Sequence, residues 1–97
     1  MLWTFINEYK GGTYIAQINA PRLYPAIEKY VEEGVPNILA LAKSKPDTID
    51  TNIIQDNLCC NEIRDVKSIY SLTLFDKKSK VMKSKDMHIN IILTAEK

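Results

Sequence analysis

The sequence contains few of the residues from which catalytic and metal centres are built. Its 97 residues include one histidine and two cysteines. His88, Cys59 and Cys60 would together supply three zinc ligands, but adjacent cysteines lack the two-residue gap of common zinc motifs. No nucleophile, acid–base pair or cofactor motif accompanies the histidine. We therefore expect no catalytic residue, no metal site and no cofactor, and we expect His88 to lie on a strand surface.

The sequence also lacks the marks of an exported or membrane protein. Neighbouring cysteines form a strained disulfide, and small secreted domains normally carry several well-separated cysteines. Residues 1–5 (MLWTF) lack the basic start and long apolar region of a secretory signal. No apolar run approaches the roughly 20 residues that a membrane-spanning helix needs. We therefore expect a cytoplasmic protein that does not bind membranes.

Neither sign of charge dominates the chain. Thirteen basic and twelve acidic side chains leave a formal charge of +1, so no global field attracts nucleic acid or an anionic membrane. The composition, 45% hydrophobic and 26% charged, is that of an ordinary globular protein. A chain of this length is expected to form a single domain over residues 1–97.

Residues 2–20 have the pattern of a β-hairpin. Two β-rich runs flank Gly11-Gly12, which suits a tight turn and lacks the GxxxxGK[ST] pattern of a phosphate loop. With both glycines as the loop, Tyr9 faces Tyr14 and Phe5 faces Ile18. This register collects on one face Trp3, Phe5, Tyr9, Tyr14, Ala16, Ile18 and Ala20. We expect that face to form the core, with a ligand cavity as the alternative.

A helix is predicted after the hairpin. The apolar residues of its stripe recur at helical spacing: Leu23, Ala26, Ile27, Tyr30 and Val31. Gly34 suits the left-handed position that ends a helix, and Pro36 is expected to prevent continuation. The carboxylates of Glu28, Glu32 and Glu33 lie on the other side, where they are expected to be solvated.

The remainder of the chain predicts the other half of an antiparallel sheet. A short apolar turn or helix is expected over residues 38–42, and a second helix from Asp47 would carry Ile49, Ile53 and Ile54. Residues 59–65 are expected to be a connection, and residues 66–75 and 87–95 to be strands. The resulting fold class is α+β, with a four-stranded antiparallel sheet (β-β-α-(α)-β-β) and one or two helices packed on one face.

The connection between the last two strands is rich in lysine. The candidate partner-binding residues are Lys77, Lys78, Lys80, Lys83 and Lys85. Such a group can bind phosphates or an acidic protein, or simply solvate a hairpin and discourage edge-to-edge association. The segment has no arginine or aromatic residue for base readout or stacking.

Two resemblances rest on short motifs. Residues 3–17 (WTFINEYKGGTYIAQ) followed by residues 26–30 (AIEKY) resemble a family of small uncharacterised bacterial proteins. The same arrangement of strand, glycine turn, Tyr-Ile-Ala strand, proline and helix is similar to HicB-type antitoxins, which have a partial RNase H-like fold. This resemblance implies a neutraliser of a partner protein, and it carries over no catalytic residue. The chain departs from that pattern because no segment matches the appended DNA-binding domain.

The sequence therefore favours a non-enzymatic protein-binding module, antitoxin- or immunity-like, whose partner is another protein. The alternative is a nucleic-acid-associated accessory protein that uses the basic hairpin of residues 77–85. An enzyme with dispersed catalytic residues is a third possibility. A homodimer through a sheet edge is also expected, because the strand over residues 87–95 has few charges to protect its edge.

Overall fold

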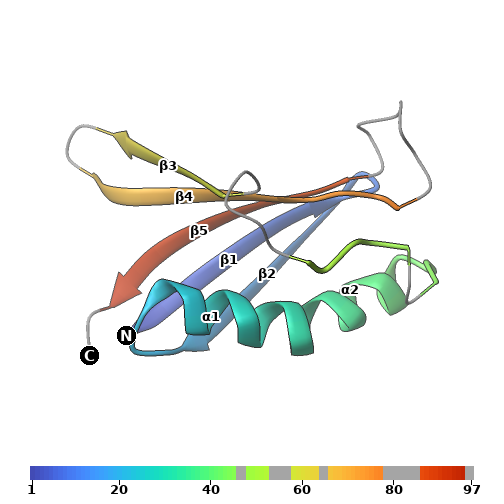
Figure 1. The fold of residues 1–97 in the computed structure, drawn as a ribbon, viewed down its shortest axis with the longest axis horizontal. Coiled ribbons are helices and arrows are strands. Elements are labelled where there is room, and N and C mark those ends of the chain that lie inside the picture. Colours follow the sequence, from blue (N-terminus) through green and yellow to red (C-terminus); the bar gives the residue numbers. More distant parts are fainter. Residues whose placement is uncertain (46–47, 53–57, 64–65, 78–85, 96–97) are drawn as a thin grey trace.

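The computed structural model describes residues 1–45, 48–52, 58–63, 66–77 and 86–95 (Figure 1). The first part of the chain forms β1 (Leu2–Tyr9), β2 (Gly12–Asn19), α1 (Leu23–Lys29), the π-helical turn η1 (Tyr30–Gly34) and α2 (Val35–Leu41). The second part forms β3 (Leu58–Ile63), β4 (Val66–Leu74) and β5 (Met87–Ala95). Figure 1 shows the helical elements together on one side of the sheet, so the α+β class is confirmed.

The strands form one antiparallel sheet in the order β2-β1-β5-β4-β3. This sheet contains the four predicted strands and a fifth, β3, in the segment that we expected to be a connection. Residues 58–63 alternate poorly in polarity, which is why the sequence pattern did not indicate a strand there.

The dimer prediction assumed that the strand over residues 87–95 has a free edge, and this assumption is wrong. β5 lies between β1 and β4 and pairs with both, so its backbone has no free edge. Its few charges reflect a central strand, whose backbone polar groups are already paired on both sides. The edges of the sheet are β2 and β3.

The N-terminal hairpin has the predicted faces but a different register. The two turn residues are Lys10 and Gly11, both with positive φ (48° and 77°), and Tyr9 pairs with Gly12. Phe5 therefore lies opposite Ala16 rather than Ile18. The register differs from the prediction by two residues, and because side chains alternate with a period of two, each still points to its predicted face.

The predicted positive φ at one of the two glycines is confirmed at Gly11. Gly11→Val is expected to lower the free energy of unfolding by about 1–3 kcal/mol, because a β-branched residue is strained at this φ. Gly12→Val is the matched control, since Gly12 has no positive φ and the three atoms nearest to an added Cβ belong to the Tyr14 side chain, at 3.0–3.2 Å. Urea denaturation measures both, and equal midpoints for the two variants would contradict the turn assignment.

The helix continues past the predicted stop. Gly34 has φ −80° and lies within the helical run, so it does not end the helix. The Val35 N–H bonds to the Tyr30 carbonyl, five residues back, and this wider turn lets the chain accommodate Pro36 at the start of α2. Glycine is needed at position 34 for packing, because a Cβ there would lie 2.9 Å from the ring of Tyr30.

The end of α2 agrees with the predicted short helix. Lys43 has φ 57°, and its N–H bonds to the Ala40 carbonyl while the Ser44 N–H bonds to the Leu39 carbonyl, which together close the helix. The helix expected from Asp47 is not present in the described part, where Ile49 forms an isolated bridge with Asp76. Asp47, Ile53 and Ile54 lie outside the described residues.

The core lies between the sheet and the helices. As predicted, Phe5, Ile18, Ile27 and Tyr30 belong to one buried cluster. The rings of Phe5 and Tyr30 stack with centroids 4.3 Å apart, joining the central part of the sheet to the helical layer. The buried Asn7 amide donates a hydrogen bond from Nδ2 to Tyr30 Oη at 2.9 Å. Phe5 and Tyr30 are therefore packing residues of the core.

Burial raises the pKa of Tyr30 to about 12, although the hydrogen bond from Asn7 acts in the opposite direction. Tyrosine in an unfolded chain titrates near pH 10. The stability due to protonated Tyr30 is therefore complete below about pH 10 and is lost as the pH rises towards 12, a loss of roughly 2–3 kcal/mol. Tyr30→Phe should remove this part of alkaline unfolding. Equal pH dependence of the urea midpoints in both proteins would refute the assignment.

Candidate functional site

The side of the sheet away from the helices presents an open surface, which we call the open face (Figure 1). The strands β1, β2, β4 and β5 contribute alternate side chains to it: Thr4, Ile6, Glu8, Thr13, Ile15, Gln17, Asn19, Ile69, Ser71, Thr73, His88, Asn90, Ile92 and Thr94. None of these side chains is buried. The alternation follows from the pleat of the strands, whose other side chains form the core.

The described side chains of the open face carry little charge. Among its described side chains, Glu8 and His88 alone are ionisable, and they lie opposite each other on β1 and β5. Exposed protein surface normally has charged residues at roughly 25–35% of positions. A sheet face of hydroxyls, amides and isoleucines is therefore unusual for a surface in contact only with water.

Isoleucines run diagonally across the open face. Ile15 lies opposite Ile6, and Ile92 lies opposite Thr4 on one side and Ile69 on the other. Ile15 is 68% exposed, and the other three isoleucines are partly exposed. Together they form an apolar band across four strands, the kind of feature that marks interaction sites.

The polar groups of the open face bond to one another. Gln17 Nε2 donates to Thr4 Oγ1 at 3.3 Å, and Thr4 Oγ1 is also in a close hydrogen bond with Thr94 Oγ1. On the neighbouring strands, Ser71 Oγ donates to Asn90 Oδ1 at 3.3 Å. Groups already paired within the surface lose less on contact with a partner than groups that depend on water.

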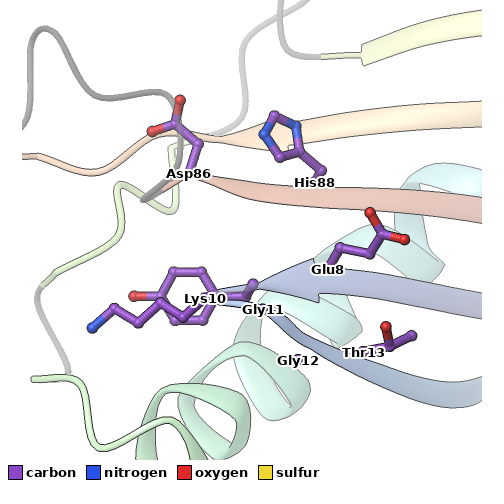
Figure 2. Close-up of a pocket in the computed structure, with 8 residues that line it drawn as sticks. Glu8, Lys10, Gly11, Gly12, Thr13, Asp86 and His88 are labelled. Carbon is purple, nitrogen blue, oxygen red and sulfur yellow. The ribbon is translucent and has the colours of Figure 1, made fainter.

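A depression of about 330 Å³ lies at the turn end of the open face (Figure 2). It is lined by Glu8, Tyr9, Lys10, Gly11, Gly12, Thr13, Asp86 and His88. Asp86 lies two residues before His88 in the chain, and the strand register places a second carboxylate, that of Glu8, directly across from His88. Glu8 becomes the neighbour of His88 through the β1–β5 pairing, which a local sequence pattern does not reveal.

The ionisable side chains of this depression differ in burial. Asp86 is buried and accepts a hydrogen bond from the Asp76 backbone N–H at 2.9 Å, so it holds the strand ends together. Glu8 and His88 are exposed, and the hydroxyl-bearing residues of the lining are Thr13 and Tyr9, whose hydroxyl is hydrogen-bonded to Ser44 Oγ. Within the described ranges, no group of three or more His, Cys, Asp or Glu side chains is placed to hold a metal ion.

The structure gathers lysines at the same end of the sheet. Lys77 is exposed, and its N–H bonds to the Thr48 carbonyl; Lys78, Lys80, Lys83 and Lys85 lie outside the described residues. Lys10 Nζ donates to Ser44 Oγ at 2.7 Å, which places Lys10 beside the exposed side chains that flank Ser44, Lys43 and Lys45. No local sequence pattern indicates this group, because Lys10 is far from Lys43 and Lys45 in the chain. We call Lys10, Lys43, Lys45 and Lys77 the basic end.

The predicted acidic helix surface lies elsewhere. Glu28 and Glu32 line a depression of about 420 Å³ with Tyr24, Val31 and the segment at residues 51–52. The three helix glutamates are exposed or partly exposed, as expected for solvated carboxylates. Although the net charge is near neutral, the described acidic helix side chains and the lysines of the basic end therefore lie on separate surfaces.

Comparison of the chain with protein-family models, with curated proteins and with solved structures finds no match. The two family resemblances thus stay predictions from sequence motifs. In the part of the chain that is described, no helix has the length and apolarity needed to span a membrane.

Proposed function

We propose that this protein is a non-enzymatic protein-binding module, of the antitoxin- or immunity-like kind, and that its partner binds the open face. The observation that carries the proposal is the scarcity of charge on this face, where Glu8 and His88 are the ionisable residues among the described side chains. The cores of protein interfaces are depleted of charged residues in the same way.

The chemistry of the face indicates the kind of surface that would bind it. The isoleucine band suits an aliphatic or aromatic surface, while hydroxyl and amide groups on both sides of the band provide neutral hydrogen-bonding positions. A partner rich in charge would lose hydration here without gaining ion pairs, except near Glu8 and His88. The resemblance to HicB-type antitoxins is consistent with a proteinaceous partner.

The test uses Asn90, an exposed open-face residue on the central strand β5. The tagged protein is used to isolate a partner, and the dissociation constant of the purified pair is then measured. Asn90→Lys should weaken binding at least tenfold, because a buried, unpaired ammonium group is costly to desolvate. Tyr24→Lys is the control, since Tyr24 is 55% exposed on α1. If both variants weaken binding equally, or if neither weakens it, the open face is not the binding surface.

The basic end supports a second candidate, a nucleic-acid-associated accessory protein. Its four described lysines come from three separate parts of the chain and add to the predicted lysine segment. We expect no measurable affinity for short RNA or DNA at physiological salt. Micromolar binding that falls steeply with salt, and that is lost on changing Lys43, Lys45 and Lys77 to Gln, would favour this second candidate instead.

A further inference from the structure

β2 is an unprotected edge strand. Among the described strands it pairs with β1 alone, and its eight residues, GTYIAQIN, include no charged residue and no proline. The β1–β2 register runs through all eight pairs without a bulge. Natural edge strands normally carry lysine, proline or bulges that prevent pairing with another chain. Because β2 is long and regular and has none of these three features, its edge is suited to pairing with a strand of another chain.

The hydrogen-bonding positions of β2 follow from the hairpin. Tyr9 and Gly12 flank a two-residue turn and therefore form a hydrogen-bonded pair. The Ala20 N–H bonds to the Met1 carbonyl at 3.0 Å, which agrees with the same alternation at the other end of the strand. The N–H and C=O groups that point away from β1 consequently belong to Thr13, Ile15, Gln17 and Asn19.

A groove of about 320 Å³ runs beside this edge, between β2 and the helices. Tyr14 and Ala16 line it from the strand, and Ile38 and Leu41 line it from α2. Leu41 is 66% exposed and Ile15 is 68% exposed, so apolar side chains flank the edge on both faces of the sheet. A strand added to β2 would place alternate side chains in this groove and against Ile15.

We propose that the occupant of this edge is a second copy of the chain, paired antiparallel through β2 with Ala16 on the two-fold axis. This register pairs Thr13 with Asn19 of the second copy and Ile15 with Gln17 of the second copy, so all four outward-facing residues are used. A two-fold centred on Ile15 would leave Asn19 without a strand partner from β2. Because the strand is uncharged, the two-fold brings no like charges together.

Ala16 also suits the axis sterically. On the helix side of the sheet it is the smallest of the three β2 side chains that would meet the second copy, the others being Tyr14 and Ile18. With Ala16 opposite itself, each Tyr14 lies opposite Ile18 of the second copy, and the two bulky pairs stand on either side of a small centre. The groove at Tyr14 and Leu41 then lies beside this Tyr14–Ile18 pair.

The dimer would join two five-stranded sheets into one continuous sheet with all helices on the same side. The two open faces would become adjacent and remain uncovered, so this proposal is independent of the proposed function. A paired edge about 27 Å long and about 10 Å wide buries less than the roughly 1,000 Å² expected of a stable interface. The dimer is therefore reversible and dissociates in the micromolar range.

Analytical ultracentrifugation over a concentration series tests the association. The wild-type protein should be mainly dimeric at several hundred micromolar and monomeric after dilution to low micromolar. Ile15→Lys should raise the dissociation constant at least tenfold with little change in melting temperature, because an edge lysine opposes strand pairing. Asn90→Lys, on the same face but on a central strand, should dimerise like the wild type. A monomeric wild-type protein at several hundred micromolar would overturn the proposal.

Cross-linking tests the register. Residues in a non-hydrogen-bonded antiparallel pair have Cα atoms about 4.5 Å apart, within disulfide reach. In a background with Cys59 and Cys60 changed to Ser, Ala16→Cys should form a covalent dimer on mild oxidation, and Thr13→Cys should not. If the protein dimerises but Ala16→Cys does not cross-link, the proposed register is wrong. If Asn90→Lys forms a normal dimer but loses partner binding, that result bears on the proposed function and leaves the dimer proposal standing.

Discussion

Phe5→Ala is expected to lower the free energy of unfolding by about 3–5 kcal/mol, the usual cost of removing a buried phenylalanine. Phe5 is fully buried in β1, and its ring stacks on Tyr30 at a centroid distance of 4.3 Å and an interplanar angle of 8°. The substitution removes that stacking and leaves a cavity between the sheet and the helical layer. Urea denaturation followed by circular dichroism measures the change.

Ile15→Ala is the matched control for Phe5→Ala. Ile15 lies in the same hairpin but is 68% exposed on the open face, so its truncation should change the stability of the monomer by less than about 0.5 kcal/mol. Measurements at low micromolar concentration keep association from contributing to the difference. A loss below about 1 kcal/mol for Phe5→Ala would show that the helix-facing side of the hairpin is not the core.

Ile27→Ala should cost about 2–5 kcal/mol, because it truncates a fully buried side chain in the helical layer. Ile27 lies in α1 and belongs to the same buried cluster as Phe5, so its effect measures the packing of the helix on the sheet. Within the same turn, Glu28→Ala is the control on the exposed side and should change stability by less than about 0.5 kcal/mol. Similar values for both substitutions would contradict the assigned orientation of α1.

The surfaces of the molecule are chemically distinct. Among its described side chains the open face has few charges, the basic end gathers lysines from separate segments, and the helices carry exposed carboxylates at Glu28, Glu32 and Glu33. The proposed partner binding and the proposed dimer use different parts of the sheet, the centre of one face and the β2 edge. Asn90→Lys changes the open face on a central strand without touching the β2 edge, whereas Ile15 belongs to both surfaces, so the Ala16→Cys cross-link tests the dimer separately.

Much of the fold was predictable because periodicity is a local property of the chain. Alternation in residues 2–20 assigned the side chains of the hairpin to their correct faces, even though the turn residues were shifted. The spacing of Leu23, Ala26, Ile27 and Tyr30 likewise predicted a helix with the correct buried side. These patterns require only neighbouring residues and the geometry of one strand or helix.

Two kinds of contact account for what the sequence pattern missed, one within the helical run and one between distant segments. Gly34 and Pro36 are a local stop signal, but the ring of Tyr30 against Gly34 and a wider helical turn carry the helix past them. The β1–β5 pairing, which makes β5 central and brings Glu8 opposite His88, joins residues about 80 positions apart. A single sequence specifies which face a strand buries, because burial follows alternation. It does not specify which strands become neighbours, because that depends on packing of the whole sheet against the helices.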